Sequence, residues 1–314
     1  MSTKKKVKLA GEKFSFKREW QKYRELYLLF LVPLTILIIF KYIPMYGAQI
    51  AFRNYKPTKG IAGSEWVGFK NFIKFFTSPY FKTTIVNTLT INVYSLLTFP
   101  LSVVFALILR YVPLKRFGKS VQMVSYAPHF ISTVVVCGLL TLFLNARIGM
   151  INKVIGLFGG TAQNWMGKTG AFKHIYVWSD VWQHLGFNSV IFISALAGVP
   201  SEQHEAAVVD GASLLQRIFH VDIPFIMPTF IILFILRVGS LLNIGYENVL
   251  MLQNDLNRGA SEIISTYTYK IALQSQVPQY SYAAAIGLFT SIINLILLLS
   301  VNKITRKMND NSLW

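Results

Sequence analysis

Residues 198–224, called here the acidic loop, gather charged side chains that are suited to binding a protein partner. The segment holds Glu202, Glu205, Asp210 and Asp222 against a single basic residue, Arg217. A group of carboxylates steers a complementary basic surface towards itself. The residue types therefore predict a docking surface in this segment.

The acidic loop also contains the signals of a short helix, a turn and a second helix. Ser201 is predicted to cap the first helix, because its hydroxyl can accept a hydrogen bond from a free backbone N–H. The two glutamates then fall in the first turn, where the helix dipole favours acids. Gly211 can adopt the left-handed conformation that ends a helix. A second short helix is predicted from Ser213 towards Pro224.

A second set of polar residues lies inside or beside predicted membrane spans. Arg237 lies about halfway along the predicted fifth span, where an ionisable side chain usually faces a cavity or a partner. Its guanidinium can bind a substrate carboxylate in a bidentate way, or it can hold helices together. Asn243, Tyr246 and Glu247 are predicted at the outer end of the same helix, where they can bind substrate hydroxyls. Asn188 in the fourth span is a similar candidate, although helix–helix bonding is the commoner role.

Five further residues are predicted near the outer membrane interface. Asp180 and Lys41 lie close enough to span ends to reach water. Trp165, Trp178 and Trp182 are predicted to anchor the protein at the interface, and stacking on a substrate ring is the less favoured alternative.

The sequence offers no catalytic or metal-binding pattern. Gly118-Lys119-Ser120 and Gly167-Lys168-Thr169 resemble the end of a phosphate-binding loop, but Pro113 and Ala162 stand where that loop needs an earlier Gly. The five His residues show no metal-ligand spacing. We therefore expect no enzyme activity, no metal site and no nucleotide site in this chain.

Composition and charge indicate a membrane protein. Of the 314 residues, 53% are apolar and only 14% are charged, whereas soluble domains carry about 25% charged residues. The net charge of +18 is explained by contact with anionic lipid and by membrane topology. A nucleic-acid partner is not expected, because no folded basic surface with stacking residues is indicated.

Six stretches reach the roughly 20 apolar residues that a helix needs to cross a bilayer. They are predicted at residues 26–47, 84–109, 121–144, 175–197, 225–245 and 283–301. The expected fold class is therefore all-α, a polytopic membrane protein with six transmembrane helices in one domain over residues 26–301. The connecting loops are too short for an independent soluble domain.

The distribution of Lys and Arg predicts that both termini are cytoplasmic. The inner flanks, residues 1–25, 110–120 and 302–314, hold 16 basic residues in 49 positions, and the predicted outer loops, residues 48–83, 145–174 and 246–282, hold 12 in 103. Cytoplasmic segments beside spans are enriched in Lys and Arg. Residues 1–25 and 302–314 are thus predicted as a basic cytoplasmic segment and a cytoplasmic tail, and the acidic loop as an inner loop.

The stretch EAAVVDGASLLQRIFHVDIP in the acidic loop resembles the EAA loop of permease subunits in binding-protein-dependent ABC importers. The family motif is E-A-A-x3-G-x9-I-x-L-P, and the identical residues are Glu205, Ala206, Ala207, Gly211 and Pro224. Val221 and Ile223 are conservative replacements of the family's Ile and Leu. In that family the motif forms a coupling helix seated in a cleft of the cytoplasmic ATPase. The resemblance implies ATPase coupling by the matching residues, with Asp210 and Arg217 in the same loop.

The resemblance extends over most of the chain. WVGFKNFIKFF (66–76) and Asn87-Thr88-Leu89 are similar to carbohydrate permeases of the maltose-transporter class, and GSLLNIGYENVLMLQN (239–254) resembles the subgroup that imports complex oligosaccharides, including uronate-containing ones. The resemblance implies a type I ABC importer permease fold in a bacterial plasma membrane and a carbohydrate substrate. It further implies a second homologous permease, two copies of an ATPase that holds the ATP and Mg, and an extracytoplasmic binding protein.

Two other classes of membrane protein remain open at this point. An ion-coupled secondary carrier or channel would work without an ATPase, and carriers often contain inverted repeats and paired broken helices. A structural or assembly protein would transport nothing. The sequence shows no internal repeat and few acids inside its spans, which favours the importer subunit.

Overall fold

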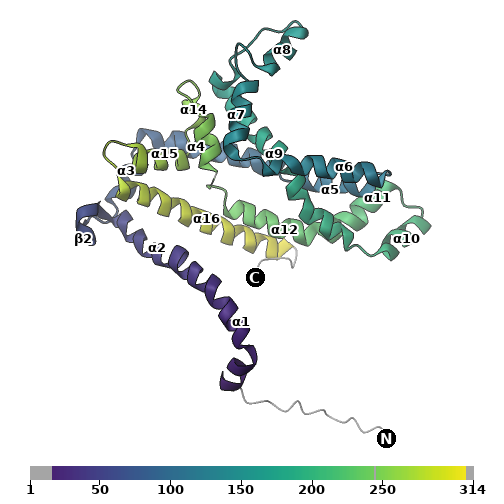
Figure 1. Cartoon of the computed structure of the whole chain (residues 1–314), viewed down its shortest axis with the longest axis horizontal. Coiled ribbons are helices and arrows are strands. Elements are labelled where there is room, and N and C mark those ends of the chain that lie inside the picture. The colour runs from purple at the N-terminus through teal and green to yellow at the C-terminus, as the bar shows by residue number, and fades with distance from the viewer. Residues whose placement is uncertain (1–15, 244, 309–314) are drawn as a thin grey trace.

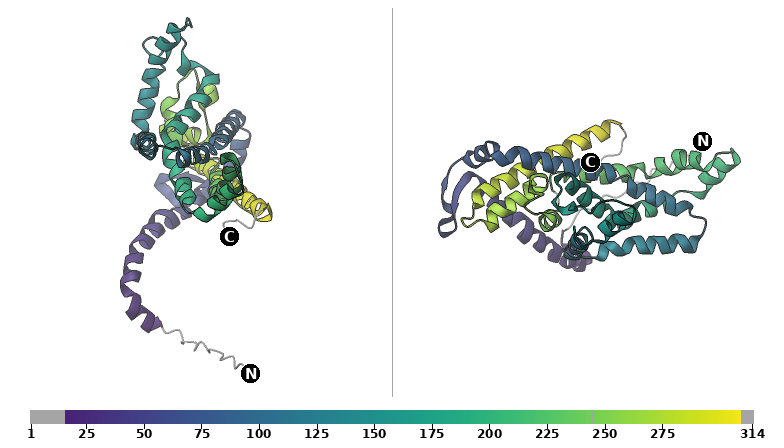
Figure 2. Two further views of the ribbon diagram at one scale, coloured as in Figure 1. Left: turned by 90° about the vertical axis from the view of Figure 1, so that its right-hand side faces the viewer. Right: turned by 90° about the horizontal axis from the view of Figure 1, so that it is seen from above.

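The computed structural model describes residues 16–243 and 245–308. Long helices form an elongated body, from which α1 (Phe16–Leu37) extends on one side and α7 (Thr133–Phe143) with α8 (Met150–Leu157) on the other (Figures 1 and 2). The predicted segments 1–25 and 302–314 lie partly outside the described residues.

The body is built around five helices. They are α4 (Pro79–Thr98), α5 (Leu101–Tyr111), α9 (Thr169–Ala197), α12 (Ile223–Gly239) and α16 (Tyr280–Met308). The other helices around them are α2 (Ile43–Met45), α3 (Lys70–Phe76), α6 (Lys115–Tyr126), α10 (Ser201–Val209), α11 (Leu214–Arg217), α13 (Tyr246–Leu252), α14 (Arg258–Ser261) and α15 (Ile264–Tyr269). Single 3₁₀ or π turns join several of them.

Four helical stretches of the described chain are long and apolar enough to cross a membrane. They are Lys22–Phe52, Pro79–Tyr111, Leu214–Gly239 and Tyr280–Lys307. Two bent pairs raise the number to six if each pair is one span: Lys115–Phe130 with Thr133–Phe143, and Thr169–Ala197 with Ser201–Val209. The helical membrane fold is thus confirmed, with between four and six spans.

The predicted third span, 121–144, is not one straight helix. The helices on either side of residues 131–132 are bent by 99°. Pro128 lies in a 3₁₀ turn before the bend, and the Ser132 hydroxyl accepts a hydrogen bond from Val135 N at the start of α7. A proline removes a backbone donor and a capped serine starts a new helix, so these two residues explain the break.

The predicted fifth span, 225–245, is displaced in the structure. The helical stretch begins at Leu214 and ends at Gly239. Ser240 has a backbone conformation outside the helical region, which ends α12. Asn243 therefore lies beyond the helix, and Tyr246 and Glu247 belong to the separate helix α13, so the prediction that all three extend the same helix is wrong.

A small β-hairpin lies at the end of the body opposite α10 (Figure 1). Strands β1 (Arg53–Lys56) and β2 (Gly60–Trp66) pair antiparallel. Gly60 has φ of +65° at the turn, a conformation that is strained for other residues. The hairpin is an addition to the all-α architecture expected from the sequence.

Helix α9 supplies much of the buried core. Phe192 and Leu196 pack with Ala106 and Leu107 of α5 and with Ile226 of α12. Nearer the hairpin end, α9 packs in a second cluster with residues of α4, α7 and α13. The core therefore fixes α9 against both α5 and α12, the helices that flank the acidic loop in space.

The first helical stretch is left uncovered by the rest of the chain along α1, whereas its end at Ala51 and Phe52 packs against α16. None of the apolar residues in its most hydrophobic window is buried, and Leu29 and Val32 are 72% and 63% exposed. Such a continuous apolar surface needs lipid or another protein to cover it.

Candidate functional site

The acidic loop forms a helical turn at one end of the molecule (Figure 1). Helix α10 is bent by 71° from α9. It begins at Ser201, with Pro200 at the capping position and no side-chain cap, so the predicted Ser201 cap is absent. The helix ends as predicted, because Gly211 has φ of +77° and its N–H donates to Val208 O.

The second helix of the acidic loop is joined directly to a membrane span. Ser213 caps α11, and Ser213 and Gln216 form a reciprocal capping box. A π turn, Ile218–Asp222, then leads into α12 without a break in the helical stretch. Any displacement of this helix start is therefore carried into α12.

The residues that match the EAA motif lie mainly on the outside of the loop. Of the matching residues, Glu205, Ala206, Gly211 and Pro224 are exposed and Ala207 is half-buried, and of the other two loop residues Asp210 is exposed and Arg217 half-buried. Val209, beside them, is 88% exposed. Glu205, Ala206, Val209, Asp210 and Gly211 form an accessible surface on α10 and the turn that follows it.

Asp222 differs from the other acids of the loop because it is fully buried. Its carboxylate lies 3.3 Å from Arg110 Nε and 3.1 Å from His204 Nε2. The acidic surface of the loop therefore consists of Glu202, Glu205 and Asp210. The sequence did not predict the ion pair between Arg110 and Asp222, because the two residues lie far apart along the chain. Arg110 was interpreted only as one of the basic residues that mark a cytoplasmic segment.

A polar cavity of about 300 Å³ lies among α4, α9 and α12 and is called here the central cavity. It is lined by Arg237, Asn188 and Asn243, three of the predicted substrate-binding residues, together with Asp180 and His184. Tyr246 and Glu247 do not line it. The structure thus brings three of the five candidates to one place.

Arg237 has free hydrogen-bonding capacity in the central cavity. It lies in the last turn of α12 rather than halfway along the span, where helix-end carbonyls favour a cation. One Nη donates to Ser95 Oγ at 2.9 Å, and the same nitrogen lies 3.9 Å from Asp180 Oδ2. Its side chain is 40% exposed. A guanidinium has five N–H donors, so several can still meet a ligand.

Asp180 faces the central cavity, which differs from the expectation that it lies near the outer interface and reaches bulk water. Its second partner is His184, one turn along α9, with Nδ1 3.0 Å from Asp180 Oδ1. The cavity therefore contains an acid held between two basic groups. Such a charged, polar lining suits a hydroxylated or ionised ligand better than an apolar one.

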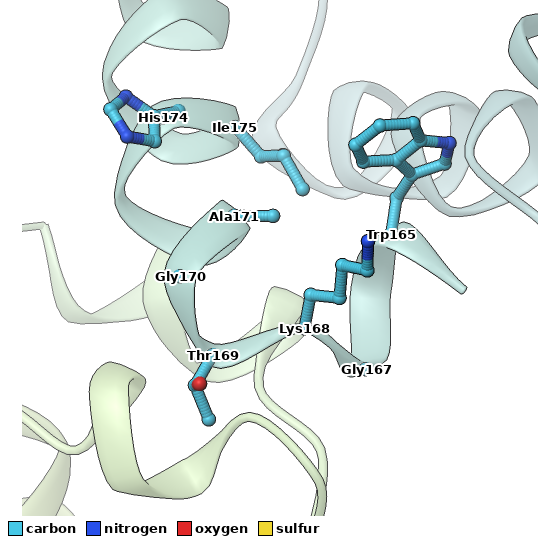
Figure 3. Close-up of a pocket in the computed structure, with 8 residues that line it drawn as sticks. All are labelled: Trp165, Gly167, Lys168, Thr169, Gly170, Ala171, His174 and Ile175. Atoms are coloured by element: carbon cyan, nitrogen blue, oxygen red, sulfur yellow. The ribbon is translucent and has the colours of Figure 1, made fainter. Parts of the chain in front are cut away.

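A second, larger hollow of about 750 Å³ lies at the start of α9 (Figure 3). Trp165 and Lys168 lie on one side and His174 on the other (Figure 3). The indole of Trp165 is fixed by donation to Asn152 Oδ1 at 2.9 Å, and Lys168 Nζ lies 5.3 Å from its ring centre. The Gly167-Lys168-Thr169 fragment forms part of this hollow and joins a 3₁₀ turn to α9.

Within residues 16–243 and 245–308, no group of three or more His, Cys, Asp and Glu side chains is placed to hold a metal ion.

Comparisons with known proteins place this architecture among transport proteins. Residues 98–310 match the family described as the binding-protein-dependent transport system inner membrane component. The chain is 37% identical to the protein LplB of Bacillus subtilis (strain 168) over 309 residues, covering 98% of this chain and 96% of LplB. It is also 37% identical to the polygalacturonan/rhamnogalacturonan transport system permease protein YteP of the same organism, covering 94% of this chain and 91% of YteP.

Solved structures agree with the sequence relatives. A chain in the crystal structure of a bacterial alginate ABC transporter, in complex with its alginate pentasaccharide-bound periplasmic protein, superposes with a TM-score of 0.87 at 32% identity. The superposition covers 95% of this chain and 99% of that chain.

Proposed function

Because this chain belongs to the family of inner membrane components of binding-protein-dependent transport systems, we propose that it is one permease subunit of an ATP-driven ABC importer for oligosaccharides and that its acidic loop couples ATP hydrolysis to transport. The observation that carries the coupling role is the exposed helix α10, which is followed by a helix continuous with α12. A partner that moves α10 can therefore reorient a membrane span.

The complete transporter contains further subunits. Two copies of a cytoplasmic ATPase bind ATP and Mg and meet the exposed face of the acidic loop. A second, homologous permease and lipid cover the apolar surface of α1, which the chain leaves open. An extracytoplasmic binding protein delivers the sugar, as the periplasmic protein does in the alginate transporter structure.

The orientation follows from the acidic loop and the basic residues. With α10 facing a cytoplasmic ATPase, the termini and residues 110–120 are cytoplasmic and the β-hairpin is outside. This arrangement agrees with the excess of Lys and Arg in residues 1–25, 110–120 and 302–314. The membrane is the plasma membrane of a bacterium.

The central cavity forms part of the substrate pathway, with Arg237, Asn188 and Asn243 in contact with the passing sugar. Tyr246 and Glu247 lie on α13, outside the cavity lining, and we do not place them on the pathway. The free donors of Arg237 suit a sugar carboxylate. Relatives named for polygalacturonan/rhamnogalacturonan and alginate transport support an acidic oligosaccharide as substrate.

Reconstitution tests the importer class directly. The purified permease pair is placed in proteoliposomes with or without its ATPase, and uptake of radiolabelled tri-galacturonate is measured in the presence of the loaded binding protein. We expect uptake only with both ATPase and ATP. Uptake driven by an ion gradient without the ATPase would instead identify a secondary carrier.

A further inference from the structure

Asp222 lies at the root of α12 in an unusual environment for a carboxylate. Its side chain is completely buried, and it lies in the π turn that joins the acidic loop to the span. A buried carboxylate is costly unless it is paired and hydrogen-bonded. π turns inside helices are frequent at functional positions. The groups around Asp222 must therefore pair with its carboxylate and stabilise it.

The partners of Asp222 come from both sides of the acidic loop. Arg110, at the end of α5, places Nε 3.3 Å from one carboxylate oxygen, and the Tyr111 hydroxyl donates to the other. His204 of α10 places Nε2 3.1 Å from the first oxygen. Arg110 also donates to the backbone carbonyl of Leu196, in the last turn of α9. One cluster thus joins α5, α9, α10 and α12.

The His204 ring can form a hydrogen bond with either Asp222 or Arg110. Its Nε2 lies 3.0 Å from Arg110 Nη2 and 3.1 Å from Asp222 Oδ1. With a proton on Nε2 the ring donates to Asp222, and without one it accepts from Arg110. The ring remains tied to the cluster in both tautomers, so the attachment does not depend on one protonation state.

His204 is also the link between α10 and the membrane helices. Its side chain is half-buried, whereas the neighbouring Glu205 is exposed. Among the described residues, the side-chain hydrogen bonds from α10 to other helices are those of His204. A force on the exposed face of α10 therefore has a direct route to Asp222 and Arg110.

We propose that His204, Asp222 and Arg110 form a joint that transmits movement of α10 to α5 and α12 during transport. This inference rests on the proposed coupling role of the acidic loop. His204 acts as a positioning residue: it holds α10 against the ends of the spans, while the exposed face of α10 meets the ATPase. Without the joint, α10 is tied to the spans only through the chain on either side of it, and less of its movement reaches them.

Two substitutions of His204 separate hydrogen bonding from side-chain volume. His204→Gln keeps an amide that can donate at the Nε2 position or accept, whereas His204→Leu has a similar volume and no hydrogen bond. Both variants leave Arg110, Tyr111 and Asp222 paired with one another. Tri-galacturonate uptake and ATP hydrolysis are both measured in the complete reconstituted transporter, in the presence of the loaded binding protein.

The number of ATP molecules hydrolysed per sugar imported is the decisive quantity. We expect His204→Leu to raise this ratio at least fivefold and His204→Gln to keep it within twofold of the unmodified transporter. An unchanged ratio in His204→Leu, including an equal loss of both activities, would overturn the joint. An equal rise in both variants would also overturn it, because hydrogen bonding would then be irrelevant.

A third variant separates failure of the joint from failure of the proposed function. Glu205→Lys reverses a charge on the exposed face of α10 and leaves His204 in place. If Glu205→Lys impairs uptake while His204→Leu keeps the normal ratio, the coupling role of the loop stands and the joint alone is wrong. If neither variant changes the ratio or the rates, the coupling role itself fails.

Discussion

Arg237 and Asp180 give the central cavity the charged lining on which we base its proposed role in sugar recognition. Arg237 is bonded to Ser95 and lies 3.9 Å from Asp180, longer than a tight ion pair. An incoming carboxylate can take the remaining guanidinium donors, while His184 stays paired with Asp180. Sugar hydroxyls can be met by Asn188 and Asn243 in the same lining. The cavity is thus suited to a sugar that carries an acid group.

The Arg237→Gln substitution tests this carboxylate contact. A hydrogen bond to a charged group contributes about 1.5–3 kcal/mol, so we expect uptake of tri-galacturonate to fall by roughly 10- to 100-fold. Uptake of its methyl ester, which has the same ring but no charge, should change by less than about threefold, because only a neutral hydrogen bond is lost. Radiolabelled uptake is measured after correction for the affinity of the binding protein for each sugar.

Tyr246→Phe provides the control for the Arg237 substitution. Tyr246 lies on α13, outside the lining of the central cavity, and its ring stacks on Tyr269 with ring centres 5.3 Å apart. Uptake of both sugars should stay close to normal in this control. An equal loss of acid and ester uptake in Arg237→Gln would show that Arg237 serves helix packing and not substrate charge.

Residue-level features were predictable where they depend on local sequence. The turn at Gly211 follows from the position of a glycine after a predicted helix, and its φ of +77° confirms that prediction. The burial of Asp222 was not predictable in the same way. Tyr111 and Asp222 are 111 positions apart, and only the packing of α5 against α9 and α12 brings them together.

The elements around the acidic loop form a short lever attached to a span. Helix α10 and the second helix are held at a fixed angle by the Gly211 turn, in which Ala212 N also donates to Ala207 O. The second helix then continues as α12. The lever works only if the turn between the two helices keeps its geometry.

Gly211→Ala should weaken coupling by straining that turn. A side chain in the left-handed region costs about 1–2 kcal/mol, so the turn should shift and alter the angle of α10. We expect uptake to fall about three- to tenfold, while the melting temperature of the complex changes by only a few degrees, because the turn is exposed. Uptake and thermal unfolding are measured on the same preparation.

Gly138→Ala is the matched control for the Gly211 substitution. Gly138 lies inside α7, and a Cβ at this position would meet no atom within 4 Å. Alanine is favoured over glycine in a helix by about 1 kcal/mol, so stability should stay equal or rise and uptake should stay normal. Equal losses from the two alanines would show that the Gly211 backbone conformation has no special role.

For the membrane helices, the sequence predicts the length of an apolar stretch better than the position of a bend within it. The apolar stretch 121–144 was long enough for a span, but Pro128 and the cap at Ser132 divide it into helices 99° apart. The β-hairpin was not predicted, because its strands are short and their pairing depends on a turn at Gly60. A mean hydropathy taken over a long stretch does not detect such local breaks.

The whole molecule has an exposed apolar arm and two chemically different ends. The α1 arm lacks cover from the chain itself, which agrees with assembly beside a second permease. The end that carries α10 presents the acidic loop, and the hairpin marks the other end (Figure 1). This arrangement predicts that the exposed residues of the two ends lie on opposite sides of the membrane.

Single-cysteine labelling tests the orientation. Val209→Cys and Phe158→Cys are introduced into a Cys137→Ala background, at positions 88% and 87% exposed in the chain. A membrane-impermeant maleimide added to intact spheroplasts should label Phe158→Cys at least tenfold faster than Val209→Cys. Permeabilisation should make the two rates similar. The reverse pattern would place the acidic loop outside and exclude its contact with a cytoplasmic ATPase.

Reversing the charge of Glu205 tests most directly whether the exposed face of α10 couples a partner ATPase to transport. Glu205→Lys is compared with Glu65→Lys, which changes an equally exposed acid in the hairpin at the opposite end. Uptake of tri-galacturonate by the complete reconstituted transporter is measured for both variants, with membrane insertion checked by quantitative blotting. We predict at least a tenfold loss of uptake for Glu205→Lys and nearly normal uptake for Glu65→Lys; normal uptake by a fully inserted Glu205→Lys transporter would show that the exposed face of α10 does not couple the ATPase to transport.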